Sequence, residues 1–510
     1  MQIEPSAQSF AARYAAGEPQ VVWTTLVADL ETPVSAYLKV AGARPEGSAP
    51  MSFLLESVEG GAVRGRYSII GLEPDVIFRV HGRHAEINRT VQTDPAAFVP
   101  INDAPLTALR HLIGDSRIAL PPTLPPMAAG VFGYLGYDMV RLMEDLPPPG
   151  PDPLGIPDAV LVRPTLIVAF DAVKDTITIV TPVRAQAGVT ANTALARAVE
   201  RLTAVVEALD RPLDKSATDL DAGPLEVKPH SNTAPDEFKR MVLRAKDYIA
   251  AGDIFQVVLS QRFEAPFKLP PFSLYRALRR VNPSPYLFFL DFGTFAVAGS
   301  SPEILVKTGG GIVTIRPIAG TRGRGATPHE DLALEVELLA DPKERAEHLM
   351  LLDLGRNDVG RVAEIGTVKV TDQFFIERYS QVMHIVSNVE GKLRHDRDAI
   401  DALAAGFPAG TVSGAPKVRA MQIIDELERE KRSLYAGAVG YFSAGEEMDS
   451  CIVLRTALIK DGTMYVQAGA GIVADSDPGF EHQECINKAA ALFRAAEEAK
   501  RFASAARRGS

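Results

Sequence analysis

The spacing of apolar residues predicts alternating strands and helices along the whole chain. In the first half, short runs rich in β-branched and aromatic residues predict strands, and helical spacing is less common. The predicted strands are 21–27, 52–55, 67–70, 76–80, 166–170 and 176–180, and the predicted helices include 34–41 and 191–209. This order favours a mixed α+β fold over a doubly wound parallel sheet.

The second half opens with a different period. Apolar residues recur at helical spacing over 238–249, and Gly252 is typical of the position just after a helix end. The next run, 254–263, alternates, with apolar residues at most odd positions and polar residues such as Gln256 at even ones. We therefore expect one face of this strand to be core and the other to be free to line a site.

Short local signals fix several element ends. Asp461-Gly462 favours the positive φ angles of a type I′ turn, which predicts a hairpin of strands 451–459 and 463–467. Asp341-Pro342 and Asp477-Pro478 each combine an N-cap acid with proline at the first helical position. Both therefore predict the start of a helix.

Two seams interrupt these patterns. The run 146–153 contains five prolines, so it can be neither a helix interior nor a central strand, and it predicts a stiff connector. The polar, proline-punctuated segment 210–235 separates the patterns of the two halves. We place a domain boundary near 225–235 and predict domains 1–225 and 226–510.

Composition narrows the class of protein. The 510 residues are 46% hydrophobic and 23% charged, as in ordinary globular chains. A formal net charge of −10 gives no electrostatic footprint for nucleic acid, so an anionic ligand needs a local basic site. Prolines interrupt the one uncharged stretch long enough to span a membrane, 118–137. We expect no membrane segment and no nucleic-acid partner.

Cysteine content and the first residues bear on the compartment. Cys451 and Cys485 are too few and too isolated for a disulfide framework or a Cys-x-x-Cys site, and neither lies in a nucleophile elbow. The N-terminal residues lack the basic and apolar regions of a signal peptide. These features predict a reducing, cytoplasmic location and disfavour covalent catalysis.

Two acidic helix segments are the first candidates for chemistry. Glu344 and Glu347 share a helical face, as do Glu484 and Lys488. Paired carboxylates can hold a hard cation or divide acid and base roles. Spacing alone leaves structural readings open, because Glu344 also fits a capping box and the later pair fits a solvated charged face.

Glycine-rich loops and one histidine are further candidates. Gly320-Thr321 and Gly469-Ala470-Gly471 follow predicted strands, but neither loop fits a dinucleotide fingerprint. Their amides could bind a carboxylate or merely form tight turns. His384 lies among apolar strand formers, where a core histidine and a functional one are both possible.

Three long motifs then occur in one characteristic order. They are 316–321 (RPIAGT), 347–358 (EHLMLLDLGRND) and 408–417 (PAGTVSGAPK). In this order they resemble the chorismate-utilising enzymes, and the similarity extends from about residue 233 to the C-terminus. Segments 53–57 and 66–71 in turn resemble the first domain of anthranilate synthase component I. The resemblance implies two intimately packed domains whose β-sheets are flanked by helices.

The resemblance also implies the site. It makes Glu347 and Glu484 the Mg²⁺ ligands and makes Glu344 the acid at the leaving hydroxyl group, with His384 and Thr411 as further catalytic positions. The positions that match chorismate contacts are Gly320, Thr321, Tyr435, Arg455, Gly469, Ala470, Gly471 and Lys488. Arg455 and Lys488 would meet the carboxylates, and the glycine-loop amides would form an anion nest.

A regulatory site is implied in the same way. In anthranilate synthases of this family, L-tryptophan inhibits through a pocket near the domain interface. The matching positions here are Glu56, Ser57, Pro285, Tyr286 and Leu287. Leu287 replaces a methionine that is common at its position, which is a volume-conserving change that should leave the pocket intact.

Two positions distinguish members of the family. Gln256 stands where isochorismate and salicylate synthases carry a lysine that activates water, and Ala319 stands where aminodeoxychorismate synthases commonly carry a nucleophilic lysine. A neutral amide and a methyl group can do neither task, so both positions favour direct attack by ammonia and formation of anthranilate. The alternatives are an aminodeoxychorismate synthase component and a catalytically inactive tryptophan-sensing scaffold.

Ammonia requires a source. Nothing in the chain resembles a glutamine amidotransferase, so the family resemblance implies a separate amidotransferase subunit, component II, in a hetero-oligomer such as a heterotetramer. Free ammonium is then expected to replace glutamine when the partner is missing.

Overall fold

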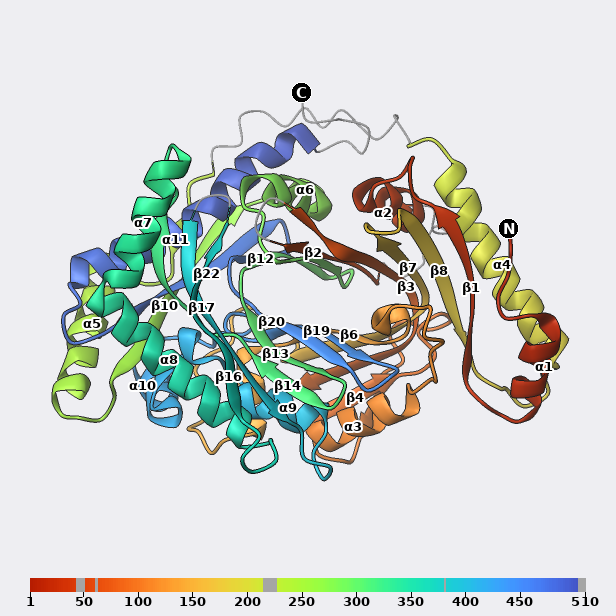
Figure 1. The fold of residues 1–510 in the computed structure, drawn as a ribbon, viewed down its shortest axis with the longest axis horizontal. Coiled ribbons are helices and arrows are strands. Elements are labelled where there is room, and N and C mark those ends of the chain that lie inside the picture. Colours follow the sequence, from red (N-terminus) through yellow and green to blue (C-terminus); the bar gives the residue numbers. More distant parts are fainter. Residues whose placement is uncertain (43–50, 60–62, 214–226, 380–381, 503–510) are drawn as a thin grey trace.

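The structure is a computed structural model that describes residues 1–42, 51–59, 63–213, 227–379 and 382–502. Its strands form two antiparallel sheets that lie face to face, with the helices on the outside (Figure 1). Among the described residues, no helix is both long and apolar enough to cross a bilayer. The antiparallel strands with helices packed outside them confirm the predicted α+β class.

The first sheet runs in the order β9-β10-β22-β21-β12-β11-β2-β3-β7-β8-β1, and β18 also pairs with β10. Its strands are β1 (Gln20–Val27), β2 (Ser52–Glu59), β3 (Val63–His81), β7 (Ala159–Asp171), β8 (Thr176–Val183), β9 (His230–Ser231), β10 (Gln256–Pro266), β11 (Tyr286–Asp291), β12 (Phe295–Ser301), β18 (Gly414–Ala415), β21 (Thr456–Lys460) and β22 (Thr463–Ile472).

The second sheet runs β5-β4-β3-β7-β6-β19-β20-β13-β14-β17, and β15 and β16 also pair with β17. Its further strands are β4 (His84–Asn88), β5 (Val99–Ile101), β6 (Gly130–Leu135), β13 (Ile304–Gly309), β14 (Ile312–Ile315), β15 (Ile318–Gly323), β16 (Lys369–Arg378), β17 (Val382–Lys392), β19 (Ala438–Ser443) and β20 (Met448–Ile452).

The two long strands β3 and β7 belong to both sheets. The first part of β3 pairs with β2 and the later part pairs with β4, while β7 pairs with β6 near its start and with β8 near its end. The change of sheet falls where Pro74 opposes Pro164, next to a register shift and to Glu73 with φ 49°. Proline cannot donate to the ladder, so the pairing breaks there and the ribbon can bend.

Three apolar cores hold the layers together. One lies between the first sheet and α1 (Ala7–Ala15), α2 (Pro33–Gly42), α4 (Ala191–Asp210), α6 (Pro271–Val281) and α11 (Pro478–Glu498). A second lies between the other sheet and α3 (Pro105–Asp115), α8 (Pro342–Gly360) and α9 (Ala399–Gly406). The third, which includes Phe53, Phe132 and Phe288, fills the space between the sheets. The result is a four-layer helix, sheet, sheet, helix arrangement.

The remaining helices complete the outer layers. They are α5 (Pro235–Ala250), α7 (Pro328–Ala340) and α10 (Lys417–Leu427), with the short 3₁₀ turns η1 (Pro126–Ala128), η2 (Tyr137–Leu142), η3 (Gly410–Val412) and η4 (Ala499–Phe502). A fourth apolar cluster packs α5 and α10 against β10 and β22.

Strands from the two predicted domains pair directly. β2 pairs with β11 and β6 pairs with β19, so each sheet contains strands from both halves of the sequence. The predicted boundary at 225/226 lies outside the described residues and stays a prediction. The polar seam does separate α4, which ends at Asp210, from α5, which begins at Pro235.

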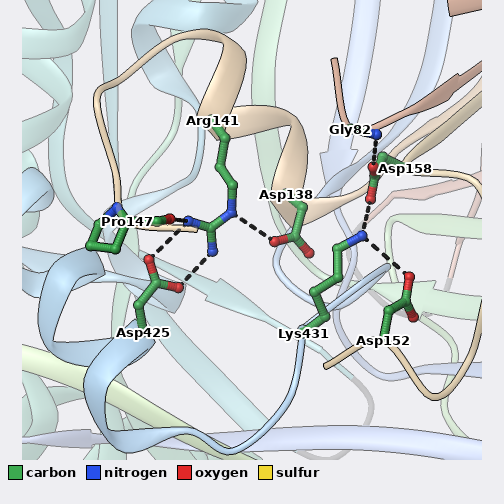
Figure 2. Close-up of polar contacts among 8 residues, drawn as sticks. All are labelled: Gly82, Asp138, Arg141, Pro147, Asp152, Asp158, Asp425 and Lys431. Carbon is green, nitrogen blue, oxygen red and sulfur yellow. Dashed lines mark hydrogen bonds and ion pairs between the residues drawn. The ribbon is translucent and has the colours of Figure 1, made fainter. Parts of the chain in front are cut away.

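The proline-rich connector is tied to the second half by ion pairs. The segment 146–153 forms neither helix nor strand, as predicted. Just before it, Arg141 donates to Asp138, to the carbonyl oxygen of Pro147 and to both carboxyl oxygens of Asp425 in α10 (Figure 2). This single guanidinium therefore joins η2, the connector and α10 in the C-terminal half.

A second ion-pair network lies beside the first. The ammonium of Lys431 lies 2.7 Å from Asp158 Oδ1 and 3.2 Å from Asp152 Oδ2, and Asp158 also accepts a hydrogen bond from the Gly82 amide (Figure 2). Lys431 and Asp158 are both largely buried, with side chains 11% and 6% exposed. Each partner therefore depends on the other for compensation of its charge.

Two strand predictions need correction. The strand at 256–266 does not have one core face and one free face, because all of its side chains except Glu264 and Pro266 are buried, with α5 and α10 packed against it. The predicted strand 451–459 is broken into β20 and β21, with Arg455 at φ 49° between them. The hairpin turn at Asp461-Gly462, with φ 49° and 73°, is confirmed.

Candidate active site

The predicted catalytic residues converge from both sheets. β22 and β10 lie at one end of the first sheet, and β15 and β17 lie at one end of the second. Helix α8 packs on β15 and β17, and α11 packs on β22, so that these elements gather on one side of the molecule (Figure 1). Each site residue is held by an element whose place is fixed by the sheets.

The pairing of β15 with β17 brings Thr321 opposite His384. His384 Nδ1 lies 3.0 Å from Thr321 Oγ1 and 3.3 Å from the carbonyl oxygen of Gly320. A carbonyl oxygen can only accept, so Nδ1 carries the proton and Nε2 is an acceptor. Within the described part of the chain, this buried Nε2 has no hydrogen-bond partner.

The environment of His384 favours its neutral form. Burial, together with the charge of Arg455, lowers the pKa of His384 to about 4. The imidazole is therefore uncharged at neutral pH, and its free acceptor nitrogen can take a proton from a bound molecule.

Glu344 lies in the first turn of α8, directly over Gly320. Gly320 has φ +81°, and a Cβ there would lie 3.3 Å from Glu344 Oε2. Arg322 donates to Glu344 at 3.0 Å and also binds Asp341 and Glu337. This arrangement fixes the carboxylate beside the Gly320-Thr321 strand.

The capping-box interpretation of Glu344 is wrong. Asp341 does cap α8, since its side chain accepts from the backbone amides of Lys343 and Glu344. The reciprocal bond cannot form, however, because the Asp341 amide already donates to the end of α7, at Glu337 and Leu338. The side chain of Glu344 is therefore used elsewhere.

Two further carboxylates and one lysine line the contact between α8 and α11. Lys488 Nζ lies 2.6 Å from Glu484 Oε1 and 3.0 Å from the carbonyl oxygen of Gly469. Burial and the nearby Glu344 raise the pKa of Glu347; Glu484 adds to this rise and Lys488 opposes it. The second acidic helix face thus lies beside Glu347 and the carbonyl oxygen of Gly469, with the Glu484 and Lys488 side chains partly exposed.

This carboxylate pair fits a hard divalent cation. Carboxylate oxygens are the ligands that Mg²⁺ prefers, and it commonly binds one or two of them together with substrate oxygens and water. The described residues contain no cluster of three or more metal-binding side chains. A cation between Glu347 and Glu484 would therefore complete its coordination with a bound substrate and water.

The glycine loop lies on β22 because neighbouring side chains approach its backbone. A Cβ at Gly469 would come within 2.8 Å of the Tyr435 hydroxyl, and one at Gly471 within 2.5 Å of Gln256 Nε2. Ala470 between them is buried on the opposite face. Glycine is therefore needed for close approach here, and the tight-turn interpretation is wrong because these residues are in a strand.

Arg455 supplies a cation at the corner between β20 and β21. Burial lowers the pKa of its guanidinium, and Tyr379 and Glu303 face it. A buried guanidinium near a site is well suited to hold a carboxylate by two hydrogen bonds.

Glu303 is a site residue that the sequence analysis missed. It lies between β12 and β13 and is 7% exposed, and the Thr411 hydroxyl donates to it at 3.1 Å from Oε1 and 3.2 Å from Oε2. Burial raises its pKa to about 8, although Thr411, the Ile318 amide and Arg455 oppose the rise. Glu303 is therefore a protonated carboxyl group at neutral pH. The only signal in the sequence is an acid placed directly after an apolar strand.

All five predicted regulatory residues line one cavity of about 800 Å³ between the two sheets. Glu56 is held by both nitrogens of Arg279, at 2.7 and 2.9 Å, and by the Tyr275 hydroxyl. The Tyr286 hydroxyl donates to Asp449 at 3.0 Å on the opposite wall. The cavity therefore combines an apolar body with fixed charges at its ends.

The same cavity reaches toward the catalytic residues. Its far wall includes Arg316, Glu377 and Tyr379. The Tyr379 hydroxyl donates to Glu377 at 2.7 Å, and its ring centroid lies 5.5 Å from that of His384. A ligand in this cavity would thus be separated from His384 by the Tyr379 side chain alone.

The fold and this site define a chorismate-binding enzyme. The family model described as chorismate binding enzyme matches residues 53–494, so the chain belongs to that family. Anthranilate synthase component 1 of Cereibacter sphaeroides is 57% identical over 99% of this chain and 100% of the relative. That of Pseudomonas putida is 48% identical over 92% and 93%. Within the family, the chain belongs with the anthranilate synthase component 1 proteins.

Solved structures agree with this assignment. The crystal structure of anthranilate synthase component I from Streptococcus pneumoniae matches with a TM-score of 0.74 and 38% identity, over 92% of this chain and 99% of that one. The menaquinone-specific isochorismate synthase of Escherichia coli matches with a TM-score of 0.68 and 20% identity, over 96% and 100%. The second likeness concerns the fold alone.

Proposed function

We propose that the chain aminates chorismate with ammonia and eliminates pyruvate to form anthranilate, the first step of tryptophan biosynthesis. The observation that carries this proposal is the convergence of an acid (Glu303), a neutral imidazole (His384) and two cations (Arg455 and Lys488) on one site. The high identity to proteins named anthranilate synthase component 1 supports it.

Binding of a dicarboxylate suits the charges of the site. Arg455 and Lys488 would each meet one carboxylate of the substrate. Along β22 the amides of 469–471 point alternately toward β10 and away from it, so only an amide that points away from β10 would donate to the substrate. Thr321, Tyr435 and Gly320 would complete the walls. Local cations are required because the chain as a whole carries a net charge of −10.

Glu347 and Glu484 would hold Mg²⁺, whose role when bound is to polarise the ring carboxylate of the substrate. Lys488, now paired with Glu484, would be released toward the substrate. Chelation of the metal is expected to abolish turnover, and Glu484→Gln is expected to weaken the binding of Mn²⁺ measured directly by electron paramagnetic resonance.

Departure of the C4 hydroxyl group needs a proton. The sequence analysis gives this task to Glu344, but Glu344 is paired with Arg322, whereas Glu303 is the carboxyl group that carries a proton at neutral pH. We therefore assign the acid to Glu303, with Thr411 fixing its orientation. Glu344 would instead order the Gly320-Thr321 strand and the chorismate ring bound against it.

His384 would act in the second half of the reaction. Ammonia attacks C2, the C4 hydroxyl leaves as water, and the resulting intermediate must lose a proton from C2 and its enolpyruvyl group to become aromatic. The uncharged Nε2 of His384 can accept that proton while Nδ1 stays bonded to Gly320. The enolpyruvyl group leaves as the enolate of pyruvate, which takes up a proton at its methylene carbon, so the elimination forms anthranilate and pyruvate with no net release of a proton.

The nucleophile is taken to be ammonia itself. Gln256 Nε2 lies against Gly471, and Ala319 is a small buried residue, so neither position offers an amine. The alternative is an aminodeoxychorismate synthase component, which would stop at an aminated, non-aromatic product. A product assay distinguishes the two.

The ammonia is proposed to come from a glutamine amidotransferase subunit in a hetero-oligomer. Both cysteines are buried, and burial raises the pKa of the Cys485 thiol to about 12 and that of Cys451 still further. Neither can serve as the thiolate that glutamine hydrolysis needs. Two unbonded cysteines also fit a cytoplasmic enzyme.

L-Tryptophan is proposed to inhibit from the cavity between the sheets. Glu56 and Asp449 offer negative charge to its ammonium group, and Ser57, Pro285, Tyr286 and Leu287 line the space for its ring. Binding beside Tyr379 would act on the His384 side of the catalytic site.

One assay tests the whole proposal. The purified chain is incubated with chorismate, MgCl₂ and ammonium chloride, and anthranilate fluorescence is followed with and without millimolar tryptophan. Tryptophan-sensitive anthranilate formation is expected, and glutamine should not replace ammonium. A non-aromatic aminated product would favour aminodeoxychorismate synthase, and the absence of any turnover would favour a sensing scaffold.

A further inference from the structure

A buried ion pair lies behind the proposed acid. Lys417 Nζ lies 2.8 Å from Asp358 Oδ2, and the two side chains are only 8% and 6% exposed. The ammonium also reaches the carbonyl oxygen of Ala405 at 3.4 Å. Both residues belong to long motifs of the sequence, but neither touches any residue assigned to the substrate or the metal.

The other carboxyl oxygen of Asp358, Oδ1, takes no part in this ion pair. Asp358 Oδ1 is fully buried and accepts no hydrogen bond of ordinary geometry among the described residues, although the Asn357 side chain lies near this carboxyl group. Burying such an oxygen without a partner costs roughly 1–3 kcal/mol. An internal hydrogen-bond donor is therefore needed at this position.

A small cavity joins Asp358 to the proposed acid. It has a volume of about 30 Å³, and its walls include Asp358, Glu303 and Thr411, together with apolar side chains from α8 and β14. One buried water needs about 10–15 Å³ of such volume and two to four polar partners. The cavity meets the volume requirement, and Asp358, Glu303 and Thr411 are three polar side chains in its walls.

We propose that this cavity is a water site that joins Asp358 Oδ1 to the Glu303 and Thr411 pair, and that Asp358 and Lys417 thereby act as positioning residues for the acid. The inference rests on the proposed function, since it assigns a support to the acid of that reaction. The water donates one hydrogen to Asp358 Oδ1 and the other to the carboxyl group of Glu303. Burial raises the pKa of Asp358, and the charge of Lys417 opposes that rise and so favours the ionised, accepting form.

This hydrogen bond has a predictable effect on Glu303. A donor to the charged form of an acid favours that form, so the water makes Glu303 a better proton donor than burial alone would leave it. The other groups that face Glu303 are Thr411, Arg455, Tyr379 and the Ile318 amide, and Arg361 also faces Asp358.

One glycine of the lining offers a way to fill part of the cavity without a clash. Gly355 lines the cavity within α8, and a Cβ there would meet Ile315 at 3.6 Å and Pro317 at 3.9 Å, which are ordinary contacts. Both neighbours also line the cavity. Gly360, at the end of the same helix, has nothing within 4 Å of such a Cβ and does not line the cavity, so it is a matched control.

The test compares Gly355→Ala and Gly360→Ala with the wild type in the ammonium-dependent assay across pH. Gly355→Ala is expected to lower kcat about threefold or more, because a weaker acid transfers its proton more slowly. The alkaline limb of its pH–rate profile should move to higher pH by about half a pH unit, and KM for chorismate should stay unchanged. Thermal stability should be equal or higher, since alanine favours a helix over glycine. The fraction of ammonium present as free ammonia changes with pH, but it is the same for all three proteins because they are assayed in the same buffers.

Crystal structures supply a readout that is independent of turnover. The wild type should show an ordered water within hydrogen-bonding distance of Asp358 Oδ1, and Gly355→Ala should lack it. A dry cavity in the wild type, or a Gly355→Ala enzyme that matches Gly360→Ala in kcat and pH profile, overturns the inference alone. A wild type that forms no anthranilate overturns the proposed function and this inference together.

Discussion

The hydroxyl group of Thr411 lies almost equally far from both carboxyl oxygens of Glu303, at 3.1 and 3.2 Å. Thr411 is in the turn η3, and Glu303 lies between β12 of the first sheet and β13 of the second. This contact therefore holds the Glu303 side chain in one position relative to the two sheets. A single hydroxyl can donate to only one oxygen at a time, which leaves the other oxygen for the proton that the reaction consumes.

Replacing the acid should uncouple activity from stability. Glu303→Gln is expected to lower kcat at least about 100-fold, the usual contribution of a positioned general acid. Gln keeps the shape and can still accept from Thr411, so chorismate binding should persist. Stopped assays of anthranilate with substrate binding by calorimetry would check both. A variant with more than a tenth of wild-type turnover would contradict the assignment of Glu303.

The same variant should change the pH dependence of stability. The pKa of Glu303 rises from 4.5 in the unfolded chain to about 8 in the folded one. The folded state therefore binds the proton more tightly, and wild-type stability falls by up to about 1.4 kcal/mol for each pH unit between these values. Glu303→Gln removes this loss. Urea unfolding should show the two proteins alike near pH 4 and the variant more stable at pH 8.

Glu344 is expected to matter for turnover but not for folding. Glu344→Gln should lose most activity, because the amide cannot keep the charged contact with Arg322 that orders the Gly320-Thr321 strand. The thermal midpoint should remain close to that of the wild type, since the Asp341 cap of α8 is untouched. Near-normal turnover would exclude any catalytic task for Glu344.

A change at His384 should separate the two halves of the reaction. His384→Ala removes the free Nε2 acceptor while β17 keeps its pairing with β15. Amination should continue and aromatisation should slow, so a non-aromatic aminated intermediate is expected to accumulate and be visible by chromatography. An unchanged rate without any such intermediate would remove His384 from the mechanism.

Tryptophan inhibition should depend on the buried carboxyl group of Asp449. Asp449→Asn leaves the shape of the cavity and the partner of Tyr286 in place but removes a charge that the ammonium group of tryptophan needs. The inhibition constant is expected to rise about tenfold or more, with kcat unchanged. The exposed Asp396→Asn is the control for loss of one charge, and equal inhibition of both variants would refute the pocket assignment.

The buried ion pairs of the connector should be essential for stability. Lys431→Met leaves Asp158 buried without its counter-charge, and removal of one partner of such a pair typically costs about 3–5 kcal/mol. The urea midpoint should fall accordingly. Arg394→Met, which breaks an exposed pair with Asp396, should leave the midpoint unchanged. Equal effects of both variants would show that Lys431 has no special role.

Motifs predicted more of the site than did periodicity. The sequence alone could not decide between cap and catalyst at Glu344, because the deciding contacts come from Arg322 and from the end of α7. Motif order predicted that Thr321, His384 and Lys488 belong to one site; the pairing of β15 with β17 brings Thr321 to His384, and Lys488 donates to the carbonyl oxygen of Gly469 in β22. Their catalytic roles stay predictions.

The misses share a physical cause. Glu303 escaped notice because its high pKa arises from burial, and its partners Thr411 and Arg455 are more than 100 residues away along the chain. The faces of β10 were assigned wrongly because the alternation of apolar and polar residues shows only which side chains share a face. Whether a face is covered depends on the elements that pack against it. Both are properties of distant contacts, which no local pattern contains.

The interleaving of strands has a consequence for biosynthesis. During translation, β2 and β6 emerge long before their partners β11 and β19, so each waits with one hydrogen-bonding edge unpaired. Unpaired edges are prone to intermolecular association. A fragment cut at the polar seam should therefore aggregate when made alone and should become soluble when co-expressed with the remainder. The two halves of the chain therefore cannot be exchanged separately between relatives unless the strand pairs β2–β11 and β6–β19 still match.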